Sequence, residues 1–295
     1  MKTQLLGLVR DSLVHYLHDK ILTEGGYINI GTGTILPGAL EVGKLSKVQN
    51  DPIYGANRVW QSPYINWVHE ISGTFPSTFT APTIASGVWI TGGFFGRNDS
   101  PHAHSIDYYN GRIIFNSAQS SSLVVRTNYS YKEVNLSFAY QDSRLLDLTR
   151  FTSAPETINQ VDFPSGSVLY LPALFIQYLK EDSAPLQIGG GKNFTYQYVL
   201  HAFAKDINTV ENITSLITKE LDNEFKVIDF RSAPTLFNQH GDRASTYITY
   251  SGLKANNTIF TGRFSDINSR GVAADKNIFR TSIFLDIEVP KDQTV

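Results

Sequence analysis

The chain of 295 residues contains no cysteine and a single methionine. Without cysteine, disulfide bonds and thiolate metal sites are excluded, and a cysteine nucleophile is excluded with them. The absence is compatible with the cytosol, or with a particle that is assembled there.

Neither sign of charge is in clear excess. The chain has 25 Lys and Arg against 27 Asp and Glu, which gives a formal net charge of −2. We therefore expect no general electrostatic attraction to nucleic acid or to anionic lipid. The sequence also has no apolar run of the ~18 residues that a membrane span needs. The first 22 residues contain too many charged side chains for a secretion signal.

Aromatic residues and turn formers are abundant. The sequence has 15 Tyr, 18 Phe and 3 Trp, together with 22 Gly and 12 Pro. This composition favours strands and turns over helices. With 41% hydrophobic and 18% charged residues, the chain is expected to be globular.

The clearest local pattern lies between residues 167 and 230. An almost continuously apolar run, Val168–Leu179, predicts a buried strand, and the alternation in Phe194–Ala204 predicts a second. Asn208 and Glu211 have the spacing of a capping box at the start of a helix over 210–221. A returning strand is expected at Phe225–Phe230. The polar, glycine-rich stretch 180–192 is expected to connect the first two strands.

Other segments show weaker patterns. A helix is expected over residues 3–22, and residues 27–59 are expected to form an extended, loop-rich arm. Gly87–Phe94 predicts a hairpin. Asn110-Gly111 predicts a two-residue type I′ turn between the strands 105–109 and 112–115. Further elements are expected as strands at 245–251, 258–264 and 279–289 and as a short helix at 144–151.

Together these elements predict an α+β fold that is mostly β. Residues 1–26 and 160–295 are expected to form a core, with an antiparallel or mixed sheet against which the N-terminal helix and one amphipathic helix pack. Residues 27–159 are expected to form a β-rich insertion with an extended arm.

The residues offer little support for catalysis. Gly38–Leu45 resembles a phosphate-binding loop, but Leu45 stands where Ser or Thr is required. His102 and His104 could form a metal pair on one strand face, although a hydrogen-bonded surface loop is the interpretation that we adopt. Arg126 and the tyrosines after it could stack on single-stranded nucleic acid, but an ordinary sheet face is the preferred interpretation. We expect no catalytic, cofactor or metal residues and no enzymatic activity.

The order of the elements resembles the neck and tail-terminator proteins of contractile-tailed bacteriophages. The resemblance rests on the first helix, the apolar strand, the glycine-rich hairpin, the alternating strand and the second helix, and on two stretches of the insertion. These segments are Leu5–Leu22, Leu171–Phe175, Gly189–Gly191, Val199–Asp206, Val210–Leu221, Ser105–Phe115 and Val125–Tyr131.

This resemblance implies a structural virion protein, assembled in the host cytoplasm, that forms a ring, terminates the tail and joins it to the head connector. A hexamer is favoured, and dodecamers occur at other levels of such necks. The partners would be connector and tail tube or sheath proteins, with DNA passing through without specific binding and no membrane involved. The expected contact residues are Trp60, Trp67, Asn110, Gly111, Gly189, Gly190 and Gly191.

Two other classes remain open from the sequence. A receptor- or carbohydrate-binding β module of a fibre or decoration protein would use Trp60, Tyr64 and Trp67 to stack on sugars. A hydrolase with paired carboxylates needs only spatial proximity, which a sequence does not display.

Overall fold

The computed structural model describes residues 5–33, 35–36, 40–41, 43–71, 80–138, 160–162, 168–187, 190–275 and 278–291. The fold is α+β and mostly β, which confirms the predicted fold class. The chain divides into two compact units. The sheet–helix unit comprises Met1–Ile21, Val134–Ser232 and Leu253–Val295, and the β-rich unit comprises Leu22–Glu133 and Ala233–Gly252.

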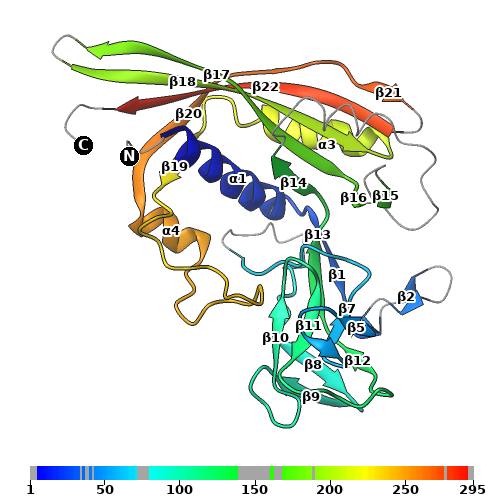
Figure 1. The fold of residues 1–295 in the computed structure, drawn as a ribbon. Coiled ribbons are helices and arrows are strands. Elements are labelled where there is room, and N and C mark those ends of the chain that lie inside the picture. Colours follow the sequence, from blue (N-terminus) through cyan, green and yellow to red (C-terminus); the bar gives the residue numbers. More distant parts are fainter. Residues whose placement is uncertain are drawn as a thin grey trace. The chain divides into compact units, whose positions relative to one another are not determined.

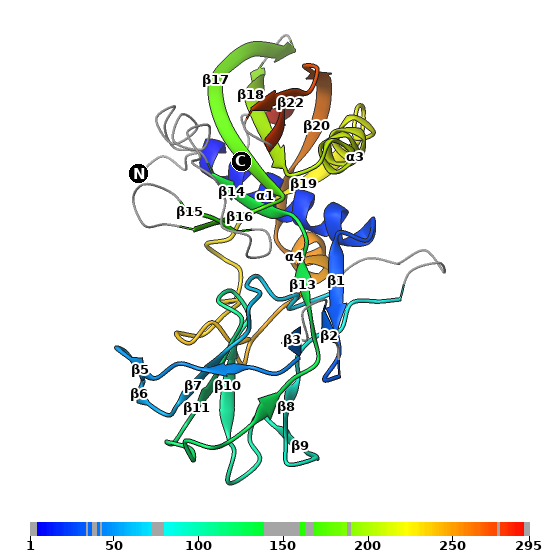
Figure 2. The same ribbon diagram turned by 90° about the vertical axis from the view of Figure 1, so that its right-hand side faces the viewer.

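A curled mixed sheet forms the framework of the sheet–helix unit (Figure 1, Figure 2). Its strand order is β14-β17-β18-β22-β20-β19, with β21 also paired to β22. Neighbouring strands are antiparallel except β14 and β17, which run parallel. The strands are β14 (Asn135–Phe138), β17 (Ala173–Gln187), β18 (Gly190–Ala204), β19 (Glu224–Ile228), β20 (Thr258–Ser269), β21 (Ala273–Asp275) and β22 (Ile278–Lys291). A separate pair joins β15 (Gln160–Asp162) to β16 (Val168–Tyr170).

Helices α1 (Leu5–Thr23) and α3 (Ile207–Thr218) pack against one face of this sheet (Figure 1). Tyr16 of α1 packs against the rings of Phe225 and Phe264, with centroids 5.5 and 5.7 Å away, and those two rings also contact each other. Its hydroxyl donates to buried Glu220, directly after α3. The apolar stripe of α1 therefore continues the core of the sheet. A third helix, α4 (Tyr250–Asn256), precedes β20.

The hairpin between β17 and β18 is longer than the sequence indicates. Both strands continue through the polar stretch 180–192, and Gln187 pairs with Gly190. The expected connection is thus mostly strand. A bulge at Leu179 interrupts the ladder between Tyr178 and Lys180. Cross-strand backbone pairing, which composition does not reveal, extends these strands.

Two further predictions, one of a helix start and one of a strand, also need correction. The cap of α3 is Asp206, whose carboxylate accepts from the Thr209 amide at 2.8 Å, so the predicted Asn208 start is wrong. The strand expected at 245–251 is absent from these described residues, and α4 begins there instead. The helix expected at 144–151 lies outside the described residues.

Short strands build the β-rich unit. One sheet has the order β10-β11-β7-β4 and another β12-β8-β9, with pairs β1-β13, β2-β3 and β5-β6. The strands are β1 (Tyr27–Ile30), β2 (Ile35–Leu36), β3 (Leu40–Glu41), β4 (Ser46–Lys47), β5 (Asn50–Asp51), β6 (Gly55–Ala56), β7 (Val59–Gln61), β8 (Gly87–Ile90), β9 (Gly93–Gly96), β10 (His104–Asp107), β11 (Arg112–Phe115), β12 (Val125–Arg126) and β13 (Tyr129–Lys132). They enclose a separate core that is rich in aromatic residues.

The observed units have different boundaries from the predicted core and insertion. Residues 233–252 belong to the β-rich unit, although the sequence placed them in the core. Strand β14 lies in the sheet–helix unit, although it was expected within the insertion. The chain thus enters the β-rich unit twice.

Candidate functional site

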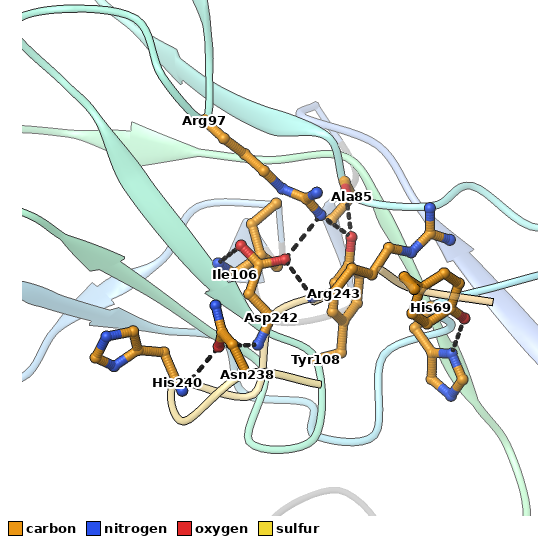
Figure 3. A network of polar contacts seen from close by, with 10 residues as sticks. His69, Ala85, Arg97, Ile106, Tyr108, Asn238, His240, Asp242 and Arg243 are labelled. Carbon is orange, nitrogen blue, oxygen red and sulfur yellow. Dashed lines mark hydrogen bonds and ion pairs between the residues drawn. The ribbon is translucent and has the colours of Figure 1, made fainter. Parts of the chain in front are cut away.

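A polar network holds the returning segment 233–252 within the β-rich unit (Figure 3). The segment forms a tight loop in which the Asn238 side-chain oxygen accepts from the amides of His240 at 2.8 Å and Asp242 at 3.2 Å. Gly241 has φ +76°, which suits a residue without a Cβ. The loop therefore presents Asp242 in a fixed position.

Asp242 satisfies donors from three places. One carboxylate oxygen accepts from the Ile106 amide at 2.9 Å, and the other accepts from the Arg243 amide at 2.7 Å. The guanidinium of Arg97 lies 3.0 Å from that second oxygen. Because β10 is an edge strand, the Ile106 amide needs a partner outside its sheet, and the carboxylate supplies it.

Aromatic side chains continue the network. The Tyr108 hydroxyl donates to the Ala85 carbonyl at 2.7 Å and accepts from Arg97. Burial raises the pKa of Tyr108 above its usual value. His69 lies 3.0 Å from the Tyr247 hydroxyl, and its ring packs edge-on against Phe237 at 4.8 Å. These buried and half-buried groups are engaged with one another, so the network positions a segment of chain.

The predicted contact residues Trp60 and Trp67 lie in the core of the β-rich unit. Each is 1% exposed. Trp60 packs edge-on against Phe115 at 5.1 Å, and Trp67 stacks on Tyr129 at 4.2 Å. Neither indole can reach a partner, so their assignment as contact residues is wrong. Their burial follows because this unit has its own core and fills it with large rings.

Burial also removes the predicted sugar-stacking surface. Tyr64 is 7% exposed and stacks on Tyr131 with ring centroids 4.1 Å apart. All three aromatics of that hypothesis are therefore covered by protein. A Trp in a sequence marks either a core or a binding surface, and only packing distinguishes them.

The turn at Asn110-Gly111 differs from the predicted type I′ form. Asp107 pairs with Arg112, so four residues connect β10 to β11. Of the predicted pair, only Gly111 has a positive φ, at +63°. Asp107 instead caps the loop, with its carboxylate accepting from the Asn110 amide at 3.0 Å. Asn110 is half-buried and Gly111 is buried, whereas Tyr109 forms the exposed tip.

Gly111 is confined by the neighbouring backbone, so we expect Gly111→Ala to destabilise the β-rich unit by about 2 kcal/mol or more. A Cβ there would lie 2.1 Å from the Tyr64 carbonyl oxygen, and φ is +63°. Gly55 is a matched control because its φ is +81° but a Cβ would meet no atom within 4 Å. Gly55→Ala should cost about 1 kcal/mol. Urea unfolding followed by tryptophan fluorescence compares them, and equal losses would contradict the steric argument.

The remaining predicted contact glycines lie at the end of the β17–β18 hairpin. Gly190 begins β18, and Gly191 is buried with φ +83°. Gly189 lies outside the described residues. The outer half of this hairpin comprises Tyr178–Gln187 and Gly190–Phe194. From here on we call it the arm; it is a different segment from the loop-rich arm expected over residues 27–59.

The arm has an exposed outer strand. Residues 178–185 are all exposed, and Leu179 at the bulge is 44% exposed. Strand β14 pairs only with Ala173–Ile176 of β17, and no other described strand adjoins the outer side of Tyr178–Gln187. Lys180 and Asp182 form an exposed ion pair at 2.8 Å. The arm thus presents an open sheet edge that carries charged side chains.

The Nδ1 atoms of His102 and His104 do not face a common position where a metal ion could bind both. His102 Nδ1 lies 2.8 Å from the Gln119 side-chain oxygen, and His104 Nδ1 donates to the His102 carbonyl at 2.8 Å. Within the described residues, no group of three or more His, Asp or Glu could hold a metal ion.

Burial lowers the pKa of His104 below its usual value, so we expect the β-rich unit to lose stability in mild acid. The unfolded chain would take up a proton near pH 6.5, before the folded protein does. The contribution of neutral His104 to stability is therefore complete above about pH 6.5, and it is lost as the pH falls toward the lower folded-state pKa. A tenfold difference in proton affinity corresponds to about 1.4 kcal/mol. Urea unfolding between about pH 5 and pH 8 measures the slope, which should flatten in His104→Gln. An unchanged slope would contradict this assignment.

No protein-family model matches the chain, and no curated protein matches it significantly. None of the described helices is long and apolar enough to cross a membrane.

Proposed function

We propose that the chain is a structural subunit of a bacteriophage neck, which forms a ring that terminates the tail and joins it to the head connector. The proposal begins from the order of elements that resembles such proteins. The exposed strand edge of the arm supports the proposal, because a neighbouring subunit could pair with it.

An open strand edge forms backbone hydrogen bonds with any suitable strand, so folded proteins normally protect it. Here the bulge at Leu179 and the charged run Lys180–Asp182 disfavour indiscriminate pairing. A neighbour with a complementary surface could still dock. When the arm of each copy meets a different surface of the next, the contact is heterologous and can close into a ring.

The composition is compatible with this role. A formal net charge of −2 suits a ring through which DNA passes without being held, since a phosphate-binding channel would be basic. The partners that we propose are further copies of the chain, with a hexamer favoured, and connector and tail tube or sheath proteins. The protein would act in the virion, without enzymatic activity.

Electron microscopy and native mass spectrometry of the purified full chain test the proposal. We expect a closed ring, and we expect Leu179→Arg to yield smaller species because it places a bulky cation on the arm. Leu221→Arg is the matched control, since Leu221 is 45% exposed and lies after α3. The control should retain the ring. A wild-type protein that stays monomeric, alone and with phage tails, would refute the neck role. A ring that Leu179→Arg leaves intact would refute the part proposed for the arm.

A further inference from the structure

The sheet β12-β8-β9 of the β-rich unit carries a hollow of about 390 Å³ on one face. This volume is within the range of small-ligand sites, about 300–1,000 Å³. The hollow is lined by Thr83, Ile84, Ser86, Gly87, Trp89, Phe94 and Asn128.

The β8–β9 hairpin places a glycine and two aromatic residues in the lining of the hollow. On β8 and β9, Gly87 pairs with Gly96, and Trp89 pairs with Phe94. Because side chains alternate along a strand, these four positions share one face. Gly87 lines the hollow and adds no side chain to it, whereas Gly96 lies outside the lining and has the Asp99 carboxylate beside it. A Cβ on Gly87 would lie 2.7 Å from the Phe94 ring, so the ring leans over this glycine.

The aromatic rings remain exposed, unlike those of the core. Trp89 is 37% exposed and Phe94 is 47% exposed. Their ring centroids are 5.3 Å apart and the planes are inclined by 59°, so they form angled walls. Exposing two adjacent large rings costs hydrophobic stabilisation, and such patches often mark binding sites.

The polar side chains that line the hollow are uncharged. They are the hydroxyls of Thr83 and Ser86 and the amide of Asn128. The Asn128 oxygen accepts from the Thr32 amide at 2.6 Å, which fixes the orientation of the side chain. Aromatic faces next to hydroxyl groups and a fixed amide match the two surfaces of a sugar ring, whose C–H face is apolar and whose hydroxyls exchange hydrogen bonds.

We propose that this hollow binds a neutral oligosaccharide, with one sugar ring packed against Trp89 and Phe94 and its hydroxyls bonded by Asn128 and Ser86. The inference rests on the β-rich unit and is independent of the neck role. It differs from the sugar surface expected from the sequence, which used aromatics that are buried.

Single-stranded nucleic acid is the competing ligand. Arg126 pairs with Trp89 in the neighbouring strand, and Lys44 forms an isolated β-bridge with Arg126. Two cationic residues are therefore in register with Trp89 across the strands. Neither lines the hollow, and the Asp99 carboxylate lies beside Gly96, where its oxygen accepts from the Gly96 amide at 2.6 Å. Asp99 does not line the hollow either, so the lining itself offers no cation to a phosphate chain. The neutral lining therefore favours sugar.

Trp89 makes the test specific, because the other two tryptophans, Trp60 and Trp67, are each 1% exposed. Binding of the full chain to a glycan array, followed by titration of the best soluble oligosaccharide, should change the tryptophan fluorescence and protect it from iodide quenching. We expect Trp89→Ala to weaken binding at least tenfold. Tyr109→Ala is the matched control, since Tyr109 is a 72% exposed aromatic on another hairpin of the same unit. It should bind as wild type does.

A second variant and a folding check keep the result decisive. Asn128→Asp preserves the size of the side chain and should weaken sugar binding severalfold through loss of the amide donor. Emission from buried Trp60 and Trp67 reports whether Trp89→Ala is folded. The proposal fails if no array glycan binds, if binding survives Trp89→Ala, or if oligo(dT) binds through Trp89 in place of sugar. Failure here leaves the ring experiment unaffected.

Discussion

Replacing Asp242 with alanine is expected to lower the free energy of unfolding of the β-rich unit by about 3 kcal/mol. The carboxylate serves the amides of Ile106 and Arg243 and the guanidinium of Arg97. Removal would leave the two amides without this acceptor and take one partner from Arg97, which also donates to Tyr108, in a site where the Asp242 side chain is only 7% exposed. A buried donor without an acceptor costs about 1–3 kcal/mol. The segment 233–252 should therefore detach more readily.

Urea denaturation followed by tryptophan fluorescence measures this loss, because all three tryptophans lie in the β-rich unit. Asp242→Asn should cost less than alanine, since the amide keeps one acceptor. Tyr109→Ala is the control, because Tyr109 lies in the same unit and is 72% exposed, and substitutions at exposed positions usually change stability by less than about 0.5 kcal/mol. If Asp242→Ala and Tyr109→Ala shift the midpoint equally, the network does not anchor the segment. Limited proteolysis should also cut residues 233–252 faster in the alanine variant.

The sequence could not predict this anchor, and the reason is physical. Asn238-Gln239-His240-Gly241-Asp242 has the composition of a turn, which its local hydrogen bonds confirm. The partners Arg97 and Ile106 are more than a hundred positions away in the chain. Local patterns do not encode such long-range contacts, so residues 233–252 were placed with the wrong unit.

Elements governed by local periodicity were predicted well. The first helix and the Gly87–Phe94 hairpin both occur, because each depends on side chains a few positions apart. The same hairpin contains the aromatic pair of the hollow, whose position could be read from its alternation. Its exposure could not, since Trp60 and Trp89 belong to similar short apolar strands and only tertiary packing buries one of them.

The arm shows a different limit of the sequence. The polar stretch 180–192 lacks the apolar alternation of a half-buried strand, and residues 180–185 of β17 are exposed. Pairing of β18 with both β17 and β22 extends the strand pattern there. Strand length is thus determined by partners across the sheet, and a stretch of charged residues can still be a strand when it faces solvent.

Helix α1 is expected to be indispensable to the sheet–helix unit, so Leu13→Ala should lower its free energy of unfolding by about 3 kcal/mol. Leu13 is fully buried, and it belongs to the same core cluster as Leu200 and Leu285 of the sheet. Alanine would leave a cavity at a position surrounded by strands and helix, where collapse is restricted. Ser12 adds a polar anchor, because its hydroxyl accepts from the Ile228 amide of β19 at 2.9 Å.

Far-UV circular dichroism during urea unfolding provides the measurement, since the helices of this unit contribute to the signal and its described residues contain no tryptophan. Leu221→Ala is the matched control, because Leu221 is in the same unit and 45% exposed, and it should cost less than about 1 kcal/mol. An amphipathic helix can instead line a channel or bind a partner. A loss below about 1 kcal/mol for Leu13→Ala would support that alternative. A loss near 3 kcal/mol would assign the helix to the core, and any ring contact would then have to come from other surfaces, such as the arm.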